Sequence, residues 1–509
     1  MKKMIVILLF AAIYGLSSCE SYLDILPDDR ITGETFWTTP EDANFALNGI
    51  YAVLRNNYTY GYGGGYDACT PNAYQWAYWE GGQMQVGDGS IYSGFGYIVS
   101  DRWTQCYKGI YRANYFLENV DQIPTMNVAI KEVMLGEVYF LRAIFYDLLV
   151  RTYGGVPLIL NTLTADEGRN VTRASAAEVW AQIHKDYDEA IKRLPTNVSE
   201  NGRATLGAAL GMKMKAYFFN SDWNKVLEYC DRIDALNKYR LFPSYYGLFQ
   251  YENEGNAETL FAVSFMDGAF SQGSIFDRYW QPQNLKYGMD GSNSVAPTQL
   301  LVDQYETLDG SPVDPANPYV NRDPRLELTI LRPGAYFQGQ LYPDEIKNHT
   351  GQRVGFGIRK YTIETMQVVG SQSPLDFMVL RYGDVLLCRA EALIETQDID
   401  AGIDLINRIR TERDDVKMPP VKKGLSQADA RKALRHERRI ELALEGQFWD
   451  DIKRWNAGPE FYPCNVIGGL GELIQVKFPN GYNLDRDNLL PIADGELAQN
   501  KNLTQNPGY

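Results

Sequence analysis

Apolar side chains recur at every third or fourth position along several stretches of this chain, as they do along one face of an α-helix. This spacing predicts single helices over residues 130–153 and 178–194. It also predicts two pairs of helices, each joined by a short polar turn, over 204–236 and 379–413. A further, strongly charged helix is expected over 426–456.

Helix pairs of this length, with small residues where two helices approach, are typical of tetratricopeptide-like repeats. We therefore predict a mainly α fold, in which a helical-hairpin scaffold supports a large irregular, loop-rich ligand-binding lobe. The scaffold is expected at about 38–57, 113–236 and 376–456. The irregular, aromatic-rich segments are expected at about 58–112 and 237–375, and a C-terminal tail follows at 457–509.

The two irregular segments stand out by composition. Residues 58–112 contain ten Tyr, three Trp, one Phe and eleven Gly in 55 positions, so a quarter of them are aromatic against 13% in the whole chain. Residues 237–375 are rich in Gly, Pro, Tyr and Asn and show little sustained periodicity. An insert of this length inside a compact domain usually has a function. We expect these segments to form an aromatic recognition surface.

The N-terminal residues 1–18 have the pattern of a lipoprotein signal peptide. A basic start at Lys2 and Lys3 precedes an apolar stretch that is too short to span a bilayer, and small residues lead to Cys19. We expect cleavage before Cys19 and thioether lipidation of Cys19, with acyl chains such as palmitate as the membrane anchor. The alternative is an ordinary secretory signal in which this cysteine is incidental.

Charge and cysteine content exclude several classes of protein. Loss of residues 1–18 removes two lysines and changes the net charge from −15 to −17. Such an acidic chain is a poor nucleic-acid binder, because phosphate contacts need clustered Lys and Arg. The five cysteines after Cys19 are odd in number and have no Cys-x-x-Cys spacing, which argues against a disulfide scaffold and a zinc site. Cys230 is expected in the core, and a bond between Cys69 and Cys106 stays open.

Five segments spread over the whole chain carry a distinctive pattern: Cys19 to Leu54, Gly136 to Leu158, Leu380 to Arg410, His436 to Trp455 and Leu490 to Tyr509. In this order they resemble the SusD/RagB family of Bacteroidetes surface lipoproteins. The resemblance implies one domain over 19–509, with about four tetratricopeptide-like hairpins and no cofactor. It implies a non-enzymatic outer-membrane protein that covers a SusC-type TonB-dependent transporter. Such proteins capture oligosaccharides or, in the RagB branch, peptides.

The motifs of the resemblance contain no ligand contacts, so candidate residues must come from chemistry. Sugar rings have an apolar C–H face and a rim of hydroxyl groups, which suits exposed Trp or Tyr with polar side chains nearby. Two short stretches, 72–80 and 276–287, combine these residue types. The alternative is that the rings pack the interior of the lobe, since large aromatic residues are mostly buried. The predicted ligand-binding residues are Tyr74, Trp76, Trp79, Tyr279, Trp280 and Tyr287.

No pattern indicates catalysis or metal binding. The three histidines are scattered, and no Gly-x-Ser-x-Gly motif is present. The basic run 431–439 alternates with Glu437, Glu441 and Glu445 at helical spacing, which predicts an ion-paired helix face. A glycoside hydrolase is the main enzymatic alternative, because two carboxylates suffice for that reaction. A subunit that only shapes the transporter is the third.

Overall fold

Helices are the main regular structure of the described residues and the strands are few and short, so the predicted mainly α fold is confirmed. The computed structural model describes residues 36–77, 79–267, 272–281, 291–342, 353–365, 368 and 372–509. Cys19 and Tyr287, two of the predicted functional residues, lie outside these ranges. None of the helices in the described ranges is long and apolar enough to cross a membrane.

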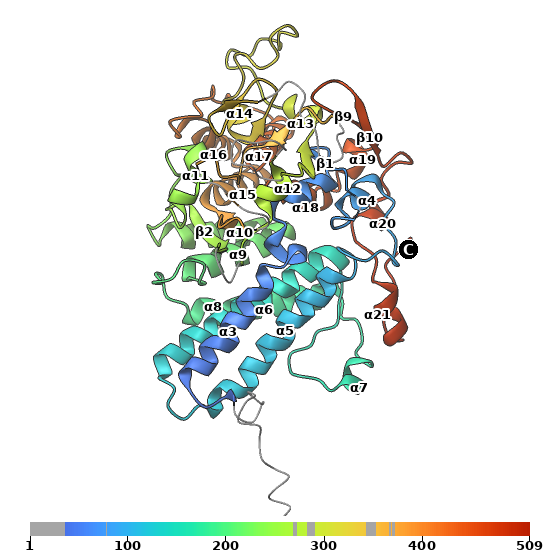
Figure 1. Cartoon of the computed structure of the whole chain (residues 1–509). Coiled ribbons are helices and arrows are strands. Elements are labelled where there is room, and N and C mark those ends of the chain that lie inside the picture. The colour runs from blue at the N-terminus through green and yellow to red at the C-terminus, as the bar shows by residue number, and fades with distance from the viewer. Residues whose placement is uncertain are drawn as a thin grey trace, which may run out of the picture.

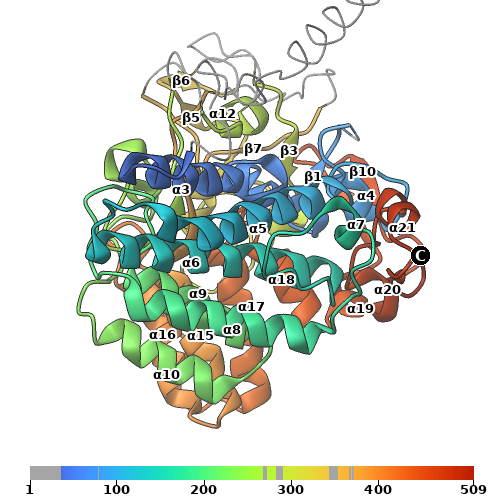
Figure 2. The ribbon, with the colours of Figure 1, turned by 90° about the horizontal axis from the view of Figure 1, so that it is seen from below.

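Successive helices pack side by side to form the scaffold (Figures 1 and 2). Contacts run from α3 to α5 and α6, then through α8, α9 and α10 to α15, which packs against α16 and α17. This order of antiparallel pairs is the tetratricopeptide-like arrangement that the sequence predicts. The helices are α3 (Pro40–Leu54), α5 (Asp101–Asn119), α6 (Val128–Tyr153), α8 (Ala176–Arg193), α9 (Leu206–Phe219), α10 (Trp223–Asp234), α15 (Tyr382–Glu395), α16 (Ile399–Thr411) and α17 (Gln427–Glu441).

Two predicted helices begin or end elsewhere in the structure. Residues 379–381 belong to strand β8 (Phe377–Arg381), which pairs antiparallel with β2 (Thr259–Val263) and so joins the insert to the scaffold. The single helix expected over 426–456 is wrong: a turn separates α17 from α18 (Gln447–Arg454). Leu444 and Gly446 have φ angles of +61° and +75°, a left-handed conformation that interrupts a helix.

The segment 58–112 is less irregular than expected, because α5 begins at Asp101. Trp103, Tyr107 and Tyr111 follow one another at four-residue intervals, so these rings report a helix face rather than a loop. The short elements before α5 are η2 (Asn57–Gly61), η3 (Gly63–Cys69), β1 (Ala73–Gln75) and α4 (Gln83–Asp88). Those after it are η4 (Val120–Gln122) and, beyond α6, α7 (Ala165–Gly168).

The insert is built from short helices and strands of two to five residues. Strand β1 pairs with β3, β4 with β7 and β5 with β6, all antiparallel. Its elements besides β2 are α11 (Tyr245–Leu248), η5 (Tyr251–Asn253), α12 (Phe276–Trp280), β3 (Val295–Pro297), α13 (Gln299–Val302), α14 (Arg325–Thr329), β4 (Ile330–Leu331), β5 (Tyr336–Phe337), β6 (Gln340–Leu341) and β7 (Gly357–Ile358). The tail contains α19 (Gly458–Phe461), the hairpin β9 (Cys464–Ile467) and β10 (Leu473–Lys477), α20 (Leu484–Asp487) and α21 (Asp494–Gln499).

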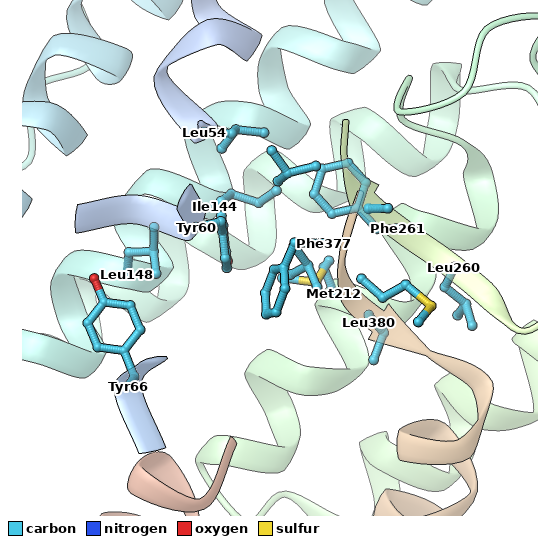
Figure 3. Close-up of a cluster of buried hydrophobic side chains, with 14 of the residues drawn as sticks. Leu54, Tyr60, Tyr66, Ile144, Leu148, Met212, Leu260, Phe261, Phe377 and Leu380 are labelled. Atoms are coloured by element: carbon cyan, nitrogen blue, oxygen red, sulfur yellow. The ribbon is translucent and has the colours of Figure 1, made fainter. Parts of the chain in front are cut away.

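The main core runs through the helical scaffold and reaches the insert at the β2–β8 pair. Figure 3 shows side chains from the end of α3, from η2, α6 and α9, and from the β2–β8 pair packed together. Leu54, Ile144, Met212, Phe261 and Phe377 are buried in this cluster. The five cysteines from Cys69 to Cys464 are free thiols; Cys230 is buried, as expected, and no disulfide joins Cys69 to Cys106.

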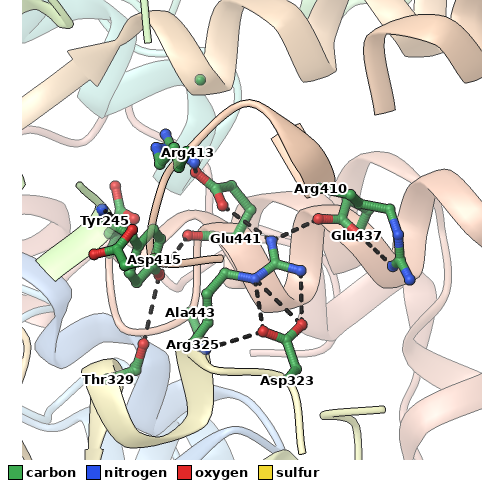
Figure 4. Close-up of polar contacts among 12 residues, drawn as sticks. Tyr245, Asp323, Arg325, Thr329, Arg410, Arg413, Asp415, Glu437, Glu441 and Ala443 are labelled. Atoms are coloured by element: carbon green, nitrogen blue, oxygen red, sulfur yellow. Dashed lines mark hydrogen bonds and ion pairs between the residues drawn. The ribbon is translucent and has the colours of Figure 1, made fainter. Parts of the chain in front are cut away.

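A buried ion cluster connects the insert to β8, to the residue Arg413 just after α16, and to α17; Figure 4 shows part of it. We define it as Arg325, Arg381, Arg413, Glu258, Glu437, Glu441 and Glu445. Glu441 contacts Arg381 at 2.8 Å, Arg413 at 2.9 Å and Arg325 at 3.0 Å. Burial alone would raise the pKa of Glu441, but Arg413, Arg381 and Arg325 lower it to about 2.

The acids of α17 are therefore ion-paired, as the sequence predicts, but they do not form a solvated helix face. Glu437 and Glu441 are enclosed, and their partners come from α14, β8 and the end of α16 rather than from the next turn of α17. Tyr245 of α11 closes the cluster by donating to the Glu441 carbonyl at 3.0 Å. The acidic residues of α17 thus connect segments that are far apart in the sequence.

Candidate functional site

The pairing of β1 with β3 brings the two predicted aromatic stretches to one place. Tyr74 stands opposite Ala296 in this pair. Directly after β1, the Trp76 backbone N–H donates to the Ser294 carbonyl at 3.3 Å, and the Trp76 ring Nε1 donates to the Asn293 carbonyl at 3.1 Å. The Ser294 N–H in turn donates to the Tyr279 carbonyl at 2.6 Å. Trp76 and Tyr279 are thus held on either side of Ser294.

Trp76 and Trp79 form an edge-to-face pair at the surface. Their ring centroids are 5.5 Å apart and the ring planes cross at 83°. Trp76 is half-buried, while Trp79 keeps 46% of its surface exposed. An indole with an exposed face, oriented by a second indole, is the kind of platform that stacks on the C–H face of a sugar.

Tyr279 continues this surface from α12. Its ring is half-buried and lies 6.2 Å from the ring of Tyr62. Tyr58 lies in the same region, and burial together with the nearby Asp101 carboxylate raises the pKa of its phenol. The Arg102 Nε of α5 donates to the Tyr58 carbonyl at 2.8 Å, which holds Tyr58 beside the start of α5.

A third set of rings comes from residues 92–97, which precede α5. The centroids of Phe95 and Tyr97 are 5.7 Å apart, and those of Tyr92 and Phe95 are 5.9 Å apart. The Ile98 N–H donates to the Gly81 carbonyl at 3.3 Å, which ties this segment to the turn after Trp79. We call the combined rings the aromatic surface: Tyr58, Trp76, Trp79, Tyr92, Phe95, Tyr97 and Tyr279.

Four of these rings, at positions 58, 92, 95 and 97, were not among the predicted site residues. The available signal was the aromatic excess of 58–112 as a whole, which does not say which rings face solvent.

Polar groups stand among the rings. Arg278 is exposed next to Tyr279, and the hydroxyl oxygens of Ser292 and Ser294 are 2.5 Å apart. Burial raises the pKa of Glu80 to about 7, although Ser294 and Arg278 act to lower it. Near neutral pH this carboxyl is present in both forms, so it can donate or accept a hydrogen bond. Hydroxyls, a guanidinium and such a carboxyl match the hydroxyl rim of a sugar.

Tyr74 and Trp280 lie in the interior. For these two rings the alternative interpretation, that they pack the inside of the lobe, is the correct one. Trp280 is 0% exposed and stacks on Phe276 with centroids 4.6 Å apart. Tyr74 is 1% exposed and packs in a small cluster with Phe337 and Tyr342. The reason is geometric: in the single turn of α12, positions 276, 277 and 280 face inward, while 278 and 279 face outward. Neither buried ring can contact a ligand in this conformation.

The histidines have local packing roles. His184 stacks on Tyr217 with centroids 4.0 Å apart, and burial lowers its pKa to about 4. A ring nitrogen of His436 lies 2.8 Å from the Gln304 carbonyl oxygen, and His349 lies outside the described residues. Within the described ranges, no group of three or more His, Cys, Asp or Glu is arranged to hold a metal ion.

Comparisons with known proteins match the chain along most of its length. A family model described as "SusD family" matches residues 257–509. A second model, described as "Starch-binding associating with outer membrane", matches residues 21–218. The chain belongs to the SusD/RagB family. The resemblance of the five segments is therefore confirmed.

Relatives of known sequence and structure agree with this assignment. SusD-like protein P38 of Formosa agariphila is 27% identical, with 99% of this chain and 98% of the relative covered. SusD-like protein P25 of the same organism is 26% identical, with 89% and 90% covered. A solved SusD-like carbohydrate-binding protein of Bacteroides fragilis superposes with a TM-score of 0.82 at 27% identity, covering 92% of this chain and all of that one. A laminarin-binding SusD-like protein, at 22% identity and a TM-score of 0.74, shares the fold.

Proposed function

We propose that this SusD-family protein is a cell-surface lipoprotein that captures oligosaccharide or polysaccharide on its aromatic surface. It delivers the ligand to a SusC-type TonB-dependent transporter in the outer membrane. The observation that carries the binding role is the meeting of Trp76, Trp79 and Tyr279 at the β1–β3 pair, with Glu80 and Arg278 beside them. The partner and the delivery step rest on membership of the family.

Binding without catalysis is the form of activity that we propose. The pair of Glu254 and Asp376 is the strongest case for a glycoside hydrolase, because burial raises the pKa of Glu254 to about 8 and that of Asp376 to about 6. The hollow that these two residues line has a volume of about 20 Å³. That space holds about one water molecule and no sugar ring. The Asp376 oxygens moreover accept from Ser264 and the Phe265 N–H.

Membrane attachment through Cys19 is part of the proposal and lies outside the described residues. Cys19→Ala should release the protein from membranes, since each buried acyl CH₂ contributes about 0.8 kcal/mol and the chains are the expected anchor. Membrane fractionation in cells without the partner transporter tests this. Undiminished membrane retention of the variant would contradict lipid anchoring.

The test of the ligand class is a glycan array and a peptide library, both presented to soluble protein that begins at Glu20. Binding of glycans, weakened by Trp79→Ala, is the expected result. Binding of peptides and of no glycan would favour the RagB-like alternative. Shortened oligosaccharides in the incubation would show an enzyme, and a folded protein with neither ligand would support a subunit that only shapes the transporter.

The test of the partner is purification in detergent at native expression. We expect an outer-membrane barrel of the TonB-dependent type to co-purify with the protein. Recovery of the protein only as a free monomer would contradict the transporter assignment and leave the glycan result standing.

A further inference from the structure

A groove with a positive lining lies beside the aromatic surface. It has a volume of about 490 Å³ and is bounded by the end of α3, one face of α5 and residues 272–273. Its charged lining consists of Arg55, Lys108 and Arg112, and no Asp or Glu among the described residues lines it. The chain as a whole has a net charge of −15, so a hollow whose charged side chains are all positive differs from the rest of the protein. The lining amides are Asn56, Gln105 and Gln272.

The cations of this groove lack carboxylate partners. Arg55 is half-buried, and burial lowers the pKa of its guanidinium, yet no ion pair compensates it within the described ranges. Lys108 is exposed and likewise has no ion pair there. Arg112 donates to the Gly49 carbonyl at 2.5 Å and leaves its remaining N–H groups for other acceptors. Desolvating a charge without a partner is unfavourable, so an anion in this groove would be stabilising.

The helix dipole explains only part of this arrangement. Arg55 is the C-cap of α3, where a positive charge is favourable. Lys108 and Arg112, however, lie in the middle of α5, where the dipole gives no such preference. Their common position in the groove therefore needs another reason.

The groove and the aromatic surface are continuous. Asp101, Gln105, Lys108 and Arg112 recur at three- and four-residue intervals, so they follow one face of α5 over about 16 Å. Asn56 lines the groove, and its side-chain oxygen accepts from the Tyr58 N–H at 2.9 Å, so the groove borders the aromatic surface at Tyr58. On the opposite wall, the chain runs from Gln272 and Gly273 to α12, which carries Tyr279. In Figure 2, α12 lies on the side of α3 that faces away from α5.

We infer that this groove binds anionic substituents, either uronate carboxylates or sulfate esters, of a polysaccharide whose neighbouring sugars stack on the aromatic surface. This inference rests on the proposed function. Guanidinium groups form charge-assisted hydrogen bonds with both kinds of anion, and an ammonium adds a point charge. The net negative charge of the protein does not prevent this, because the Debye length is about 10 Å at 0.1 M salt and the groove cations act at contact.

Three polymers with one backbone separate charge from backbone recognition: dextran, dextran sulfate and carboxymethyl dextran of equal length. We expect the wild type to bind one or both charged polymers at least about tenfold more tightly than dextran by calorimetry. Added salt should reduce this advantage. Arg55→Gln/Lys108→Gln should abolish it. The matched control is Lys185→Gln/Arg240→Gln, which removes one exposed Lys and one exposed Arg outside the groove. Thermal unfolding checks that both variants fold.

The outcomes are distinct from those of the proposed function. Preference for dextran sulfate alone identifies sulfate esters, and preference for carboxymethyl dextran alone identifies uronates. No advantage of either charged polymer overturns the inference, as does an equal loss in the control variant. If array glycans bind through Trp79 without any effect of charge, the proposed function stands and the inference fails. If the charged polymers bind through the groove and no array glycan binds, the groove binds anions, but the capture of glycans on the aromatic surface is contradicted.

Discussion

The buried ion cluster and the aromatic surface use large side chains under opposite conditions. Around Glu441 the charged groups are enclosed and contact opposite charges from other elements at 2.8–3.0 Å. On the aromatic surface the rings touch one another, and Trp79 is 46% exposed. Removal of a charged side chain from the cluster leaves an opposite charge buried without a partner, which is costly in folding free energy. Removal of a surface ring uncovers little buried apolar area and should change that free energy little. The first region is therefore constrained by folding, whereas we propose that the second is constrained by the ligand.

The residues that carry the family resemblance follow the same division. Arg381 lies in the segment Leu380 to Arg410, and Glu437 and Glu441 lie in the segment His436 to Trp455. All three belong to the ion cluster. The rings that we assign to ligand binding lie outside both segments. The resemblance thus reports how the chain folds and leaves the choice of glycan to the surface.

The largest effect is expected from Glu441→Ala. This change leaves Arg381, Arg413 and Arg325 without a shared partner, and breaking a buried ion pair costs about 3–5 kcal/mol. Because three cations are affected, we expect a loss in the free energy of unfolding of about 5 kcal/mol. Urea denaturation measures it. As a control, Glu412→Ala removes an exposed pair with Arg408 and should cost about 0–1 kcal/mol. Equal losses in the two variants would remove the distinction between cluster and surface.

The next effect concerns Trp280, the buried tryptophan of the insert. Trp280→Ala should reduce the free energy of unfolding by about 3–5 kcal/mol, because the ring is fully enclosed and stacks on Phe276. Thermal and urea unfolding measure this loss. A Trp280→Ala protein that keeps wild-type stability but loses glycan affinity would show that the ring contacts ligand in another conformation.

Opposite pH dependences should distinguish the ion cluster from the insert. The pKa of Glu441 is lowered to about 2, so its stabilising contribution is complete above its unfolded value of about 4.3 and is lost as the pH falls toward 2. Burial raises the pKa of Asp277 to about 7, although its hydrogen bonds lower it. The folded state then binds the extra proton between about pH 4 and 7, and stability falls as the pH rises through that range.

Asp277→Asn isolates the second effect. Its stability relative to the wild type should increase from pH 5 to pH 8, by up to about 1.4 kcal/mol per pH unit below the folded pKa. Urea denaturation across this range provides the measurement. Asp414→Asn, at an exposed carboxylate, is the control and should show no such trend. A parallel pH curve for wild type and Asp277→Asn would mean that this carboxyl is ionised in the folded protein.

The scaffold could be predicted because amphipathic helices display their packing in the sequence. The prediction failed where a different signal dominated: aromatic residues hid the start of α5, and the turn at Leu444 divided a continuous charged run. Strands of two or three residues, such as β1 and β3, are too short to show alternation. Their pairing joins residues 73–75 to 295–297, and no local pattern encodes a contact over that distance.

The candidate site was predictable by residue type but not by orientation. Trp76, Trp79 and Tyr279 were named from their chemistry, and the structure gathers them on one surface. Tyr279 and Trp280 are neighbours, yet one faces outward and the other inward. A helix of five residues has no second turn that would reveal which side is apolar. The same limit hid Tyr58 and Tyr97, which reach the surface only through tertiary packing.

The smallest effect on stability is expected from Trp79→Ala, and it is the one that bears on ligand binding. The exposed indole contributes little to the core, so the melting temperature should stay close to that of the wild type. If the ring stacks on a sugar, its loss removes a contact of about 1 kcal/mol beyond buried area, and affinity should fall about tenfold. Calorimetry with an array-selected glycan measures this. Tyr111→Ala is the matched control, because this exposed ring stacks on Tyr115 and lies outside the aromatic surface. Similar affinity losses in both variants, or unchanged affinity in Trp79→Ala, would place the binding site elsewhere on the molecule.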